Sequence, residues 1–224
     1  WAAYITGEYE VDCHWTATAG FGHAERPPTL TELYALDPFL AILQQGFSTV
    51  RGNANLEQER LWQMDLGLRG DFGRFRTGIH GFYAWVEDYI TFKTLGTPLG
   101  VRDSVGVQFV NTELATLSGG EVYAEYDWNE YLTPFAVMSY VEGRDHTRGE
   151  RGIPPGLPGG AEEPLPGIPP LESRIGVRVH EPVSEPTERP RWGIELAARV
   201  VDNQDRVASS LLERESAGFT TWDL

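Results

Sequence analysis

Cysteine, positive charge and long apolar runs are all scarce in this sequence of 224 residues. Its single cysteine, Cys13, excludes an intrachain disulfide framework, and we expect it to be a small apolar residue within a strand. No run of 18 apolar residues is present, which excludes a membrane-spanning helix. The 18 Lys and Arg residues against 33 Asp and Glu give a net charge of -15, which would repel phosphates and argues against a nucleic-acid partner.

A starting methionine and a signal peptide are also missing. The chain opens at Trp1 inside an alternating pattern and stops inside another, TTWDL, so we expect it to be a fragment. What is plentiful is glycine, at 25 residues, proline, at 15, and aromatic side chains, at 12%. That mixture favours strands and turns over helices.

Alternation of apolar and polar residues is the dominant signal along the chain, and it predicts an all-β fold. In LWQMDLGLRGD, for example, Trp62, Met64, Leu66 and Leu68 share one face. Charges of both signs occupy the opposite face of the strands, at Asp65, Arg69, Glu121, Glu125, Asp127, Arg174, Arg178, Glu195 and Arg199. Nine segments are predicted to be strands: 4–12, 13–25, 57–71, 75–92, 107–128, 132–146, 171–181, 190–203 and 218–224.

Alternation alone does not say which face meets the protein interior. A soluble, secreted all-β ligand-binding module would bury its apolar face against a second sheet. A transmembrane β-barrel would turn that face outward to lipid and keep a polar lumen. Burial of Trp62, Leu66, Ile194 and Leu196 distinguishes the two.

The lengths of the connections favour the barrel. Long links, at 26–56, 93–106, 147–170 and 204–217, alternate with shorter links at 71–74, 127–132 and 182–189. In an up-and-down antiparallel meander this order places every long link at one end, as in outer-membrane barrels.

Aromatic residues and strand lengths agree with a membrane barrel. Several segments exceed the usual length of globular strands and reach the ~9–11 residues of a tilted transmembrane strand. Aromatic residues gather near the short-link end, as in the girdle at a bilayer interface: Trp15, Phe72, Phe75, Trp128, Tyr131 and Trp192.

Short motifs follow one another in a fixed order along nearly the whole chain. A strand leads into GFGHAERPPTLTELYAL, and GNANLEQERLWQMDLGL and GFYAWVEDYITF follow. The residues of this ordered set are Arg26, Pro28, Thr29, Glu32, Leu33, Tyr34, Gly52, Asn53, Leu56, Glu59, Asp88, Tyr89, Ile90, Val110, Asn111, Gly120, Glu121, Ile168, Pro169 and Pro170. The set resembles the second half of a TonB-dependent outer-membrane receptor.

The resemblance implies a partial barrel over residues 1–224, about nine strands of an up-and-down barrel of 22. The plug domain, the first half of the barrel and the terminal strands are not in this sequence, so we expect open sheet edges and no transport by this polypeptide alone. In the family, a receptor in the cell outer membrane takes up a scarce ligand, commonly a ferric siderophore, cobalamin, haem or a saccharide. Its implied partners are outer-membrane lipid, a small-molecule or metal-chelate ligand, and TonB through the missing plug segment.

On this interpretation residues 29–55 form an extracellular loop with a short helix capped by Thr31. Arg26 and Tyr34 are candidate ligand contacts, although the position of Arg26 favours an anchor that bonds loop carbonyls. We expect 26–56 and 147–170 to select the ligand, and we assign no binding residue.

No catalytic constellation is present, so we predict that the chain is not an enzyme. G-x-S-x-G and H-E-x-x-H are both absent. His23 and His146 lie near the predicted extracellular end and are candidates for holding a metal chelate, but isolated histidines are more often plain surface or lumen residues. We therefore predict no metal site and no cofactor.

Overall fold

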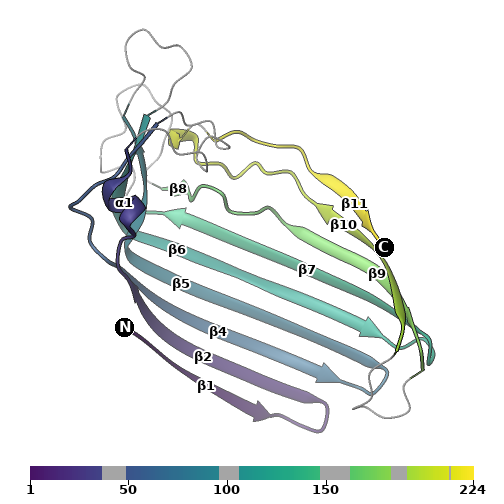
Figure 1. Cartoon of the computed structure of the whole chain (residues 1–224). Coiled ribbons are helices and arrows are strands. Elements are labelled where there is room, and N and C mark those ends of the chain that lie inside the picture. The colour runs from purple at the N-terminus through teal and green to yellow at the C-terminus, as the bar shows by residue number, and fades with distance from the viewer. Residues whose placement is uncertain (37–48, 96–105, 147–161, 183–190, 212) are drawn as a thin grey trace.

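A computed structural model describes residues 1–36, 49–95, 106–146, 162–182, 191–211 and 213–224. It shows one curved antiparallel sheet whose strands follow each other in chain order (Figure 1). The strands along this path are β1 (Ala2–Glu10), β2 (Trp15–Arg26), β4 (Glu59–Asp71), β5 (Phe75–Thr94), β6 (Gly106–Tyr126), β7 (Leu132–Asp145), β9 (Glu172–His180), β10 (Gly193–Val201) and β11 (Phe219–Asp223).

Four small elements complete the described fold. Strand β3 (Thr49–Arg51) pairs in parallel with β6, and β8 (Glu163–Pro164) pairs with β7. The helix α1 (Leu30–Tyr34) and the 3-10 turn η1 (Ser209–Leu211) lie in links between strands. None of the helices in the described residues is long and apolar enough to cross a membrane, a result with no bearing on a β-barrel.

The nine predicted strands are confirmed, with boundaries that differ by a few residues. The pairing of consecutive antiparallel strands also confirms that the long and the short links lie at opposite ends of the sheet. Four connections, at 11–14, 72–74, 127–131 and 181–192, join strands at one end of the sheet. The links after β2, β5, β7 and β10 all leave from the other end, which we call the loop end.

The apolar face is exposed, as the barrel interpretation predicts. Leu66 is 63% exposed, Ile194 59% and Leu196 45%, and Trp62 is half-buried by its neighbours Phe21 and His23 within the same face. The described residues contain no second sheet that covers these side chains. The exposure of these side chains favours the barrel over a soluble module with a dry core between two sheets.

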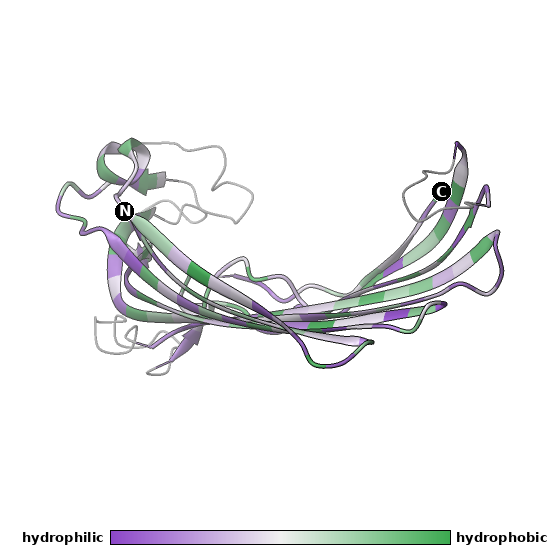
Figure 2. Ribbon diagram, turned by 90° about the horizontal axis from the view of Figure 1, so that it is seen from below, coloured by the Kyte–Doolittle hydropathy of each residue, from purple (hydrophilic) through white to green (hydrophobic). Residues whose placement is uncertain are grey.

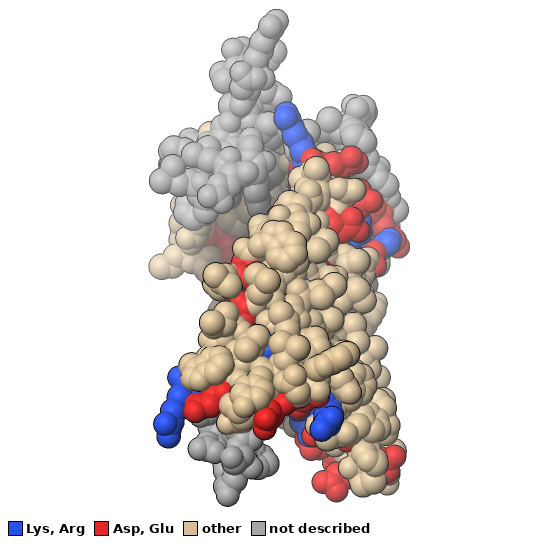
Figure 3. Space-filling view, turned by 90° about the vertical axis from the view of Figure 1, so that its right-hand side faces the viewer, with Lys and Arg blue, Asp and Glu red and all other residues tan. Residues whose placement is uncertain are grey.

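The polar face is the concave one. Arg26 and Glu59 lie opposite each other on that face, and Arg26 reaches across to Glu32 of α1. Figure 2 shows the sheet curved like a trough, with α1 on its hollow side. From the side of β9 to β11, most acidic and basic side chains appear toward the two ends of the molecule, with a broad band of other residues between them (Figure 3).

Ion pairs between strands connect the charges of the concave face. Arg178 of β9 lies 3.0 Å from Glu195 of β10 and 3.7 Å from Glu125 of β6. Arg76 of β5 contacts Asp127 at 2.7 Å. Opposite charges on adjacent strands stabilise the pairing of those strands. The acidic and basic side chains of this face thus neutralise one another in a water-filled lumen.

Aromatic side chains gather at the short-link end, in agreement with the girdle prediction. Phe72 makes an edge contact with Trp15 and stacks with Phe75. Trp128 is 65% exposed and packs against Tyr126.

The prediction that Cys13 is a small apolar strand residue is wrong. Cys13 is exposed in the turn between β1 and β2. The carboxylate of Asp12 accepts hydrogen bonds from the backbone N–H groups of His14 and Trp15, which closes the turn and ends the ladder.

Candidate functional site

Charged and amide side chains from widely separated segments meet at the loop end of β2, β4 and β6. We call Arg26, Glu32, Asn53, Glu59 and Asn111 the loop-end cluster. All five belong to the motifs that resemble the TonB-dependent receptors. These motifs are scattered along the sequence, and their side chains together hold the first long loop against the wall.

Arg26 joins two carboxylates at the centre of the cluster. Its Nε donates to Glu59 Oε2 at 2.6 Å, and its two terminal nitrogens donate to the two Glu32 oxygens at 3.0 Å each. A guanidinium with two-point contact to a carboxylate fixes orientation as well as distance. Arg26 is therefore an anchor, as expected, but it anchors the loop through carboxylates and not through loop carbonyls.

Glu59 ties the anchor to the wall. Its side chain is buried, and its second oxygen, Oε1, accepts the backbone N–H of Ile90 at 2.7 Å. A buried carboxylate without such partners would be costly. Arg26 therefore compensates the negative charge of Glu59, and the backbone of β5 supplies a hydrogen bond to its second oxygen.

The helix α1 is capped two residues earlier than predicted. Thr29, and not Thr31, is the N-cap: its side chain accepts the N–H of Glu32, and the Glu32 side chain accepts the N–H of Thr29. This reciprocal capping box satisfies two N–H groups that the helix itself leaves without partners. Pro27 and Pro28 precede the cap and cannot extend the β2 ladder.

The charge state of Glu32 follows from the same contacts. Burial alone would raise the pKa of Glu32, but the hydrogen bonds from Arg26 and Thr29 outweigh it and hold the pKa below its usual value. Glu32 therefore stays ionised at neutral pH, which the contact with Arg26 requires.

The return of the loop to the wall rests on Gly52 and Asn53. A Cβ at Gly52 would lie 2.5 Å from backbone atoms of Leu33 and Tyr34, so only glycine allows this approach to α1. The N–H of Asn53 donates to the Glu32 carbonyl at 2.9 Å, and its side chain donates to the Phe109 carbonyl at 3.3 Å.

Asn111 of β6 bonds to β5 and to the segment just before β4. Its Oδ1 accepts the N–H of Glu57, and its Nδ2 donates to the carbonyls of Glu57 and Asp88. Asp88 has a φ of 55°, a left-handed conformation that is uncommon for a non-glycine residue. The hydrogen bond from Asn111 Nδ2 to the Asp88 carbonyl holds the backbone in that conformation.

An apolar cluster lies beside these polar contacts. Val50 of β3 and Leu211 of η1 are both 1% exposed and pack with side chains of β5 and β6. The members of this cluster are Val50, Ile90, Val107, Phe109, Ala208 and Leu211. Links that are distant in sequence thus converge on the concave face at the loop end, where η1 of the last long link contacts β5.

The two histidines proposed for a metal chelate are not brought together. His23 lies on the apolar face between Trp1 and Trp62, with ring centroids at 4.5 and 4.0 Å. His146 follows β7, where its ring contacts Thr116 and Glu162. The separation of β2 from β7 by three strands explains why they do not meet.

Exposed apolar side chains of α1 complete the description of the loop end. Leu30 is 77% exposed and Tyr34 is 67% exposed. Tyr34 is available for contact with another molecule, whereas Arg26 is occupied by its two carboxylates. The predicted ligand-selecting segments are 26–56 and 147–170, and within them residues 37–48 and 147–161 lie outside the described residues.

A hollow of about 1190 Å³ lies over the middle of the sheet. Its lining includes Leu66, Ile79, Tyr83, Val122 and Met138 of the apolar face, together with His80 and Glu121. None of the residues of the loop-end cluster lines it, so we do not assign ligand selection to this hollow.

The exposed apolar face, the charged concave face and the links gathered at one end are the features of an outer-membrane β-barrel wall with a polar lumen. The chain matches the family described as "TonB dependent receptor-like, beta-barrel" over residues 2–224, and it belongs to this family. Its location is accordingly the outer membrane. The search of curated proteins found no match.

Solved structures of transport receptors share this fold. A structure described as the copper transporter OprC is 25% identical, with a TM-score of 0.71, and the match covers 98% of this chain and 30% of that one. The siderophore receptor PirA from Pseudomonas aeruginosa is 15% identical, with a TM-score of 0.61 and coverage of 99% and 35%. The FrpB iron transporter from Neisseria meningitidis is 16% identical, with a TM-score of 0.60 and coverage of 98% and 30%. The chain thus spans about a third of the length of these proteins.

Proposed function

We propose that this chain forms part of the barrel of a receptor that takes up a scarce ligand with energy delivered through TonB. The observation that carries the proposal is the convergence of several links on the concave face at the loop end, above a charged inner wall. Ligands of this type are ferric siderophores, cobalamin or haem. Copper joins them because it is the cargo named for the structure that is 25% identical.

The orientation follows from the inequality of the two ends. In outer-membrane barrels the long loops face the outside of the cell and the short turns face the periplasm. We infer that the loop end of this sheet is extracellular, that a ligand meets it first, and that the exposed side of Tyr34 belongs to the ligand-facing surface.

Further strands and a plug domain would complete the receptor. In the described residues β1 and β11 each pair on one side only, and the matched structures are about three times as long. The inner wall carries ion pairs such as Arg178–Glu195. A plug domain inside the barrel could form polar contacts with these side chains and exchange them for others. The proposed role is transport, with no catalytic step.

Removal of part of a loop tests the proposal. In the full-length receptor, residues 148–160 are deleted, which keeps Glu163 and its hydrogen bonds of 2.6 and 2.5 Å to Ser210. Ligand binding and uptake are then measured separately with ferric siderophores, cobalamin, haem and copper. Loss of binding for one of these, with the barrel still assembled, supports the proposal.

The matched control shortens 183–190 at the opposite end, which we expect to leave binding unchanged. If no ligand of these classes binds the intact receptor, the proposed ligand class is wrong. If binding and uptake survive the 148–160 deletion, the segment has no selecting role and 26–56 remains the candidate.

A further inference from the structure

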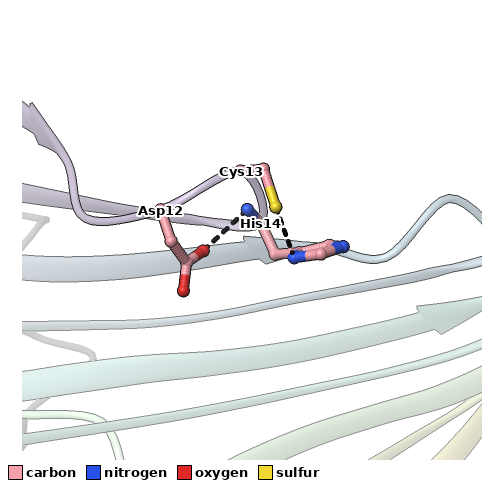
Figure 4. A group of neighbouring side chains, drawn as sticks. All are labelled: Asp12, Cys13 and His14. Carbon is pink, nitrogen blue, oxygen red and sulfur yellow. Dashed lines mark hydrogen bonds between the residues drawn. The ribbon is translucent and has the colours of Figure 1, made fainter.

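The turn between β1 and β2 brings three different metal-binding groups together, far from the loop end. Asp12, Cys13 and His14 offer a carboxylate oxygen, a thiol sulfur and an imidazole nitrogen that all lie within 4.8 Å of one another (Figure 4). Cys13 Sγ lies 3.1 Å from His14 Nδ1. Of the residues that the structure describes, this is the one group of three with such spacing.

Neighbouring residues restrict two of the three donors. The imidazole of His14 stacks on Phe72 of the next turn, with a centroid distance of 5.1 Å and an interplanar angle of 13°. The His14 carbonyl also accepts the N–H of Asp71 at 2.8 Å, which fastens the two turns together. Asp12 uses Oδ1 for two backbone N–H groups, at 2.7 and 2.9 Å, which leaves Oδ2 for a cation.

We propose that Asp12, Cys13 and His14 bind a thiophilic first-row cation of the zinc and copper class, with a fourth position filled by water. The donor set selects this class, since Zn²⁺ and copper combine thiolate with imidazole, whereas Ca²⁺ and Mg²⁺ require oxygen ligands. Binding replaces the thiol proton: the Cys13 S–H bond breaks, a sulfur–metal bond forms, and one proton passes to solvent.

The geometry requires only a small adjustment. Tetrahedral Zn²⁺ with bonds of about 2.3 Å to sulfur and 2.0 Å to nitrogen places those two atoms roughly 3.5 Å apart. The observed 3.1 Å thus has to open by a few tenths of an ångström. Because all three residues are exposed, the thiol can turn without disturbing the sheet.

This site is separate from the proposed ligand entrance. The turn lies at the short-link end, whereas the loop-end cluster lies at the other end of the same strands. Failure of the metal proposal therefore leaves the uptake proposal intact, and the two are tested on different parts of the chain.

The test uses the full-length receptor in detergent, freed of metal, with Co²⁺ as the spectroscopic probe. We expect one equivalent of Co²⁺ with a thiolate-to-cobalt charge-transfer band, displacement by Zn²⁺, and release of a proton on binding. Cys13→Ser should abolish the band. His14→Ala should weaken affinity by at least about tenfold, since loss of an outer-shell partner alone costs about 10–100-fold.

His80→Ala is the matched control. His80 is an exposed histidine near a carboxylate, at 3.7 Å from Asp65, and no sulfur accompanies it in the ion pair, so its loss should leave the band and the affinity unchanged. Heat-modifiable migration in electrophoresis confirms that each variant still forms a barrel. Absence of the charge-transfer band, or equal Co²⁺ affinity in wild type and Cys13→Ser, would mean an adventitious ion only and would overturn the proposal.

Discussion

Arg26 and Glu59 stand opposite each other on β2 and β4, joined by a hydrogen bond of 2.6 Å from Nε to Oε2. This pair links the wall of the barrel to the first long loop, because the same guanidinium holds Glu32 of α1. Loop position is thereby coupled to strand pairing through one side chain.

Replacement of Arg26 with alanine should release the loop. The change leaves the buried carboxylate of Glu59 without its cation, which costs on the order of 3–5 kcal/mol when the partner of a buried pair is removed. We expect rapid proteolysis within 29–56 in the assembled receptor. Arg60→Ala is the control, since its pair with Glu87 is exposed and longer, at 3.5 Å, and such pairs contribute about 0–1 kcal/mol. Equal protease sensitivity of the two variants would contradict the anchoring role.

A methyl group at position 52 should have a similar effect through sterics alone. Gly52→Ala places Cβ at 2.5 Å from backbone atoms that cannot rotate away, and overpacking of this kind costs about 1–3 kcal/mol. Gly7→Ala on β1 provides the control, because nothing lies within 4 Å of the added carbon. Hydrogen exchange of the amides in 29–36 and 49–56 measures the difference. Normal protection in Gly52→Ala would show that the loop tolerates a wider approach.

Charge on the apolar face should destabilise the barrel in the membrane. Leu66→Arg puts a cation on the exposed outer face, at an expected cost of about 2–4 kcal/mol if the site lies near the bilayer midplane. The control Glu121→Arg places the same side chain on the polar face of β6. Unfolding in lipid vesicles by denaturant gives both values, and a loss that is no larger for Leu66→Arg would argue against lipid at this face.

Acid should loosen the loop through Glu32. Its pKa in the folded state lies below its usual value, so its contribution to stability is present above the unfolded pKa of about 4.3 and is lost as the pH falls through the folded pKa. We expect protease sensitivity of 29–56 to rise in that acidic range. Glu32→Gln should already be sensitive at neutral pH and should change less on acidification. An identical pH profile in wild type and variant would exclude Glu32 as the titrating group.

Ligand contact at the exposed side of α1 is a separate prediction. Tyr34→Ala should weaken ligand binding by about tenfold, the effect of losing ~1.4 kcal/mol of contact energy, without affecting protease resistance of the loop. Leu30→Ala, on the same helix, tests whether the effect is specific to the aromatic ring. Unaltered affinity in both variants would remove α1 from the ligand surface.

Sequence patterns predicted the long strands well because alternation over 9 to 21 residues is a strong, local signal. They missed β3 and β8, which have 3 and 2 residues and form only through partners distant in sequence. The roles of Arg26 and Glu59 were equally hidden, since the contact spans 33 residues and depends on register. Thr31 and Cys13 show a different limit: a one- or two-residue error in a boundary moves a residue from cap to helix or from turn to strand.

The parallel pairing of β3 with β6 makes the position of the first long loop depend on strands that follow it in the chain. Asn53 and Glu57 find their partners 56 and 54 residues downstream, in Phe109 and Asn111. Both partners lie on β6, which is held beside β4 only through β5. The position of this loop thus depends on the register of three neighbouring strands, so a shift in the pairing of β5 would displace the loop without any change in its own sequence.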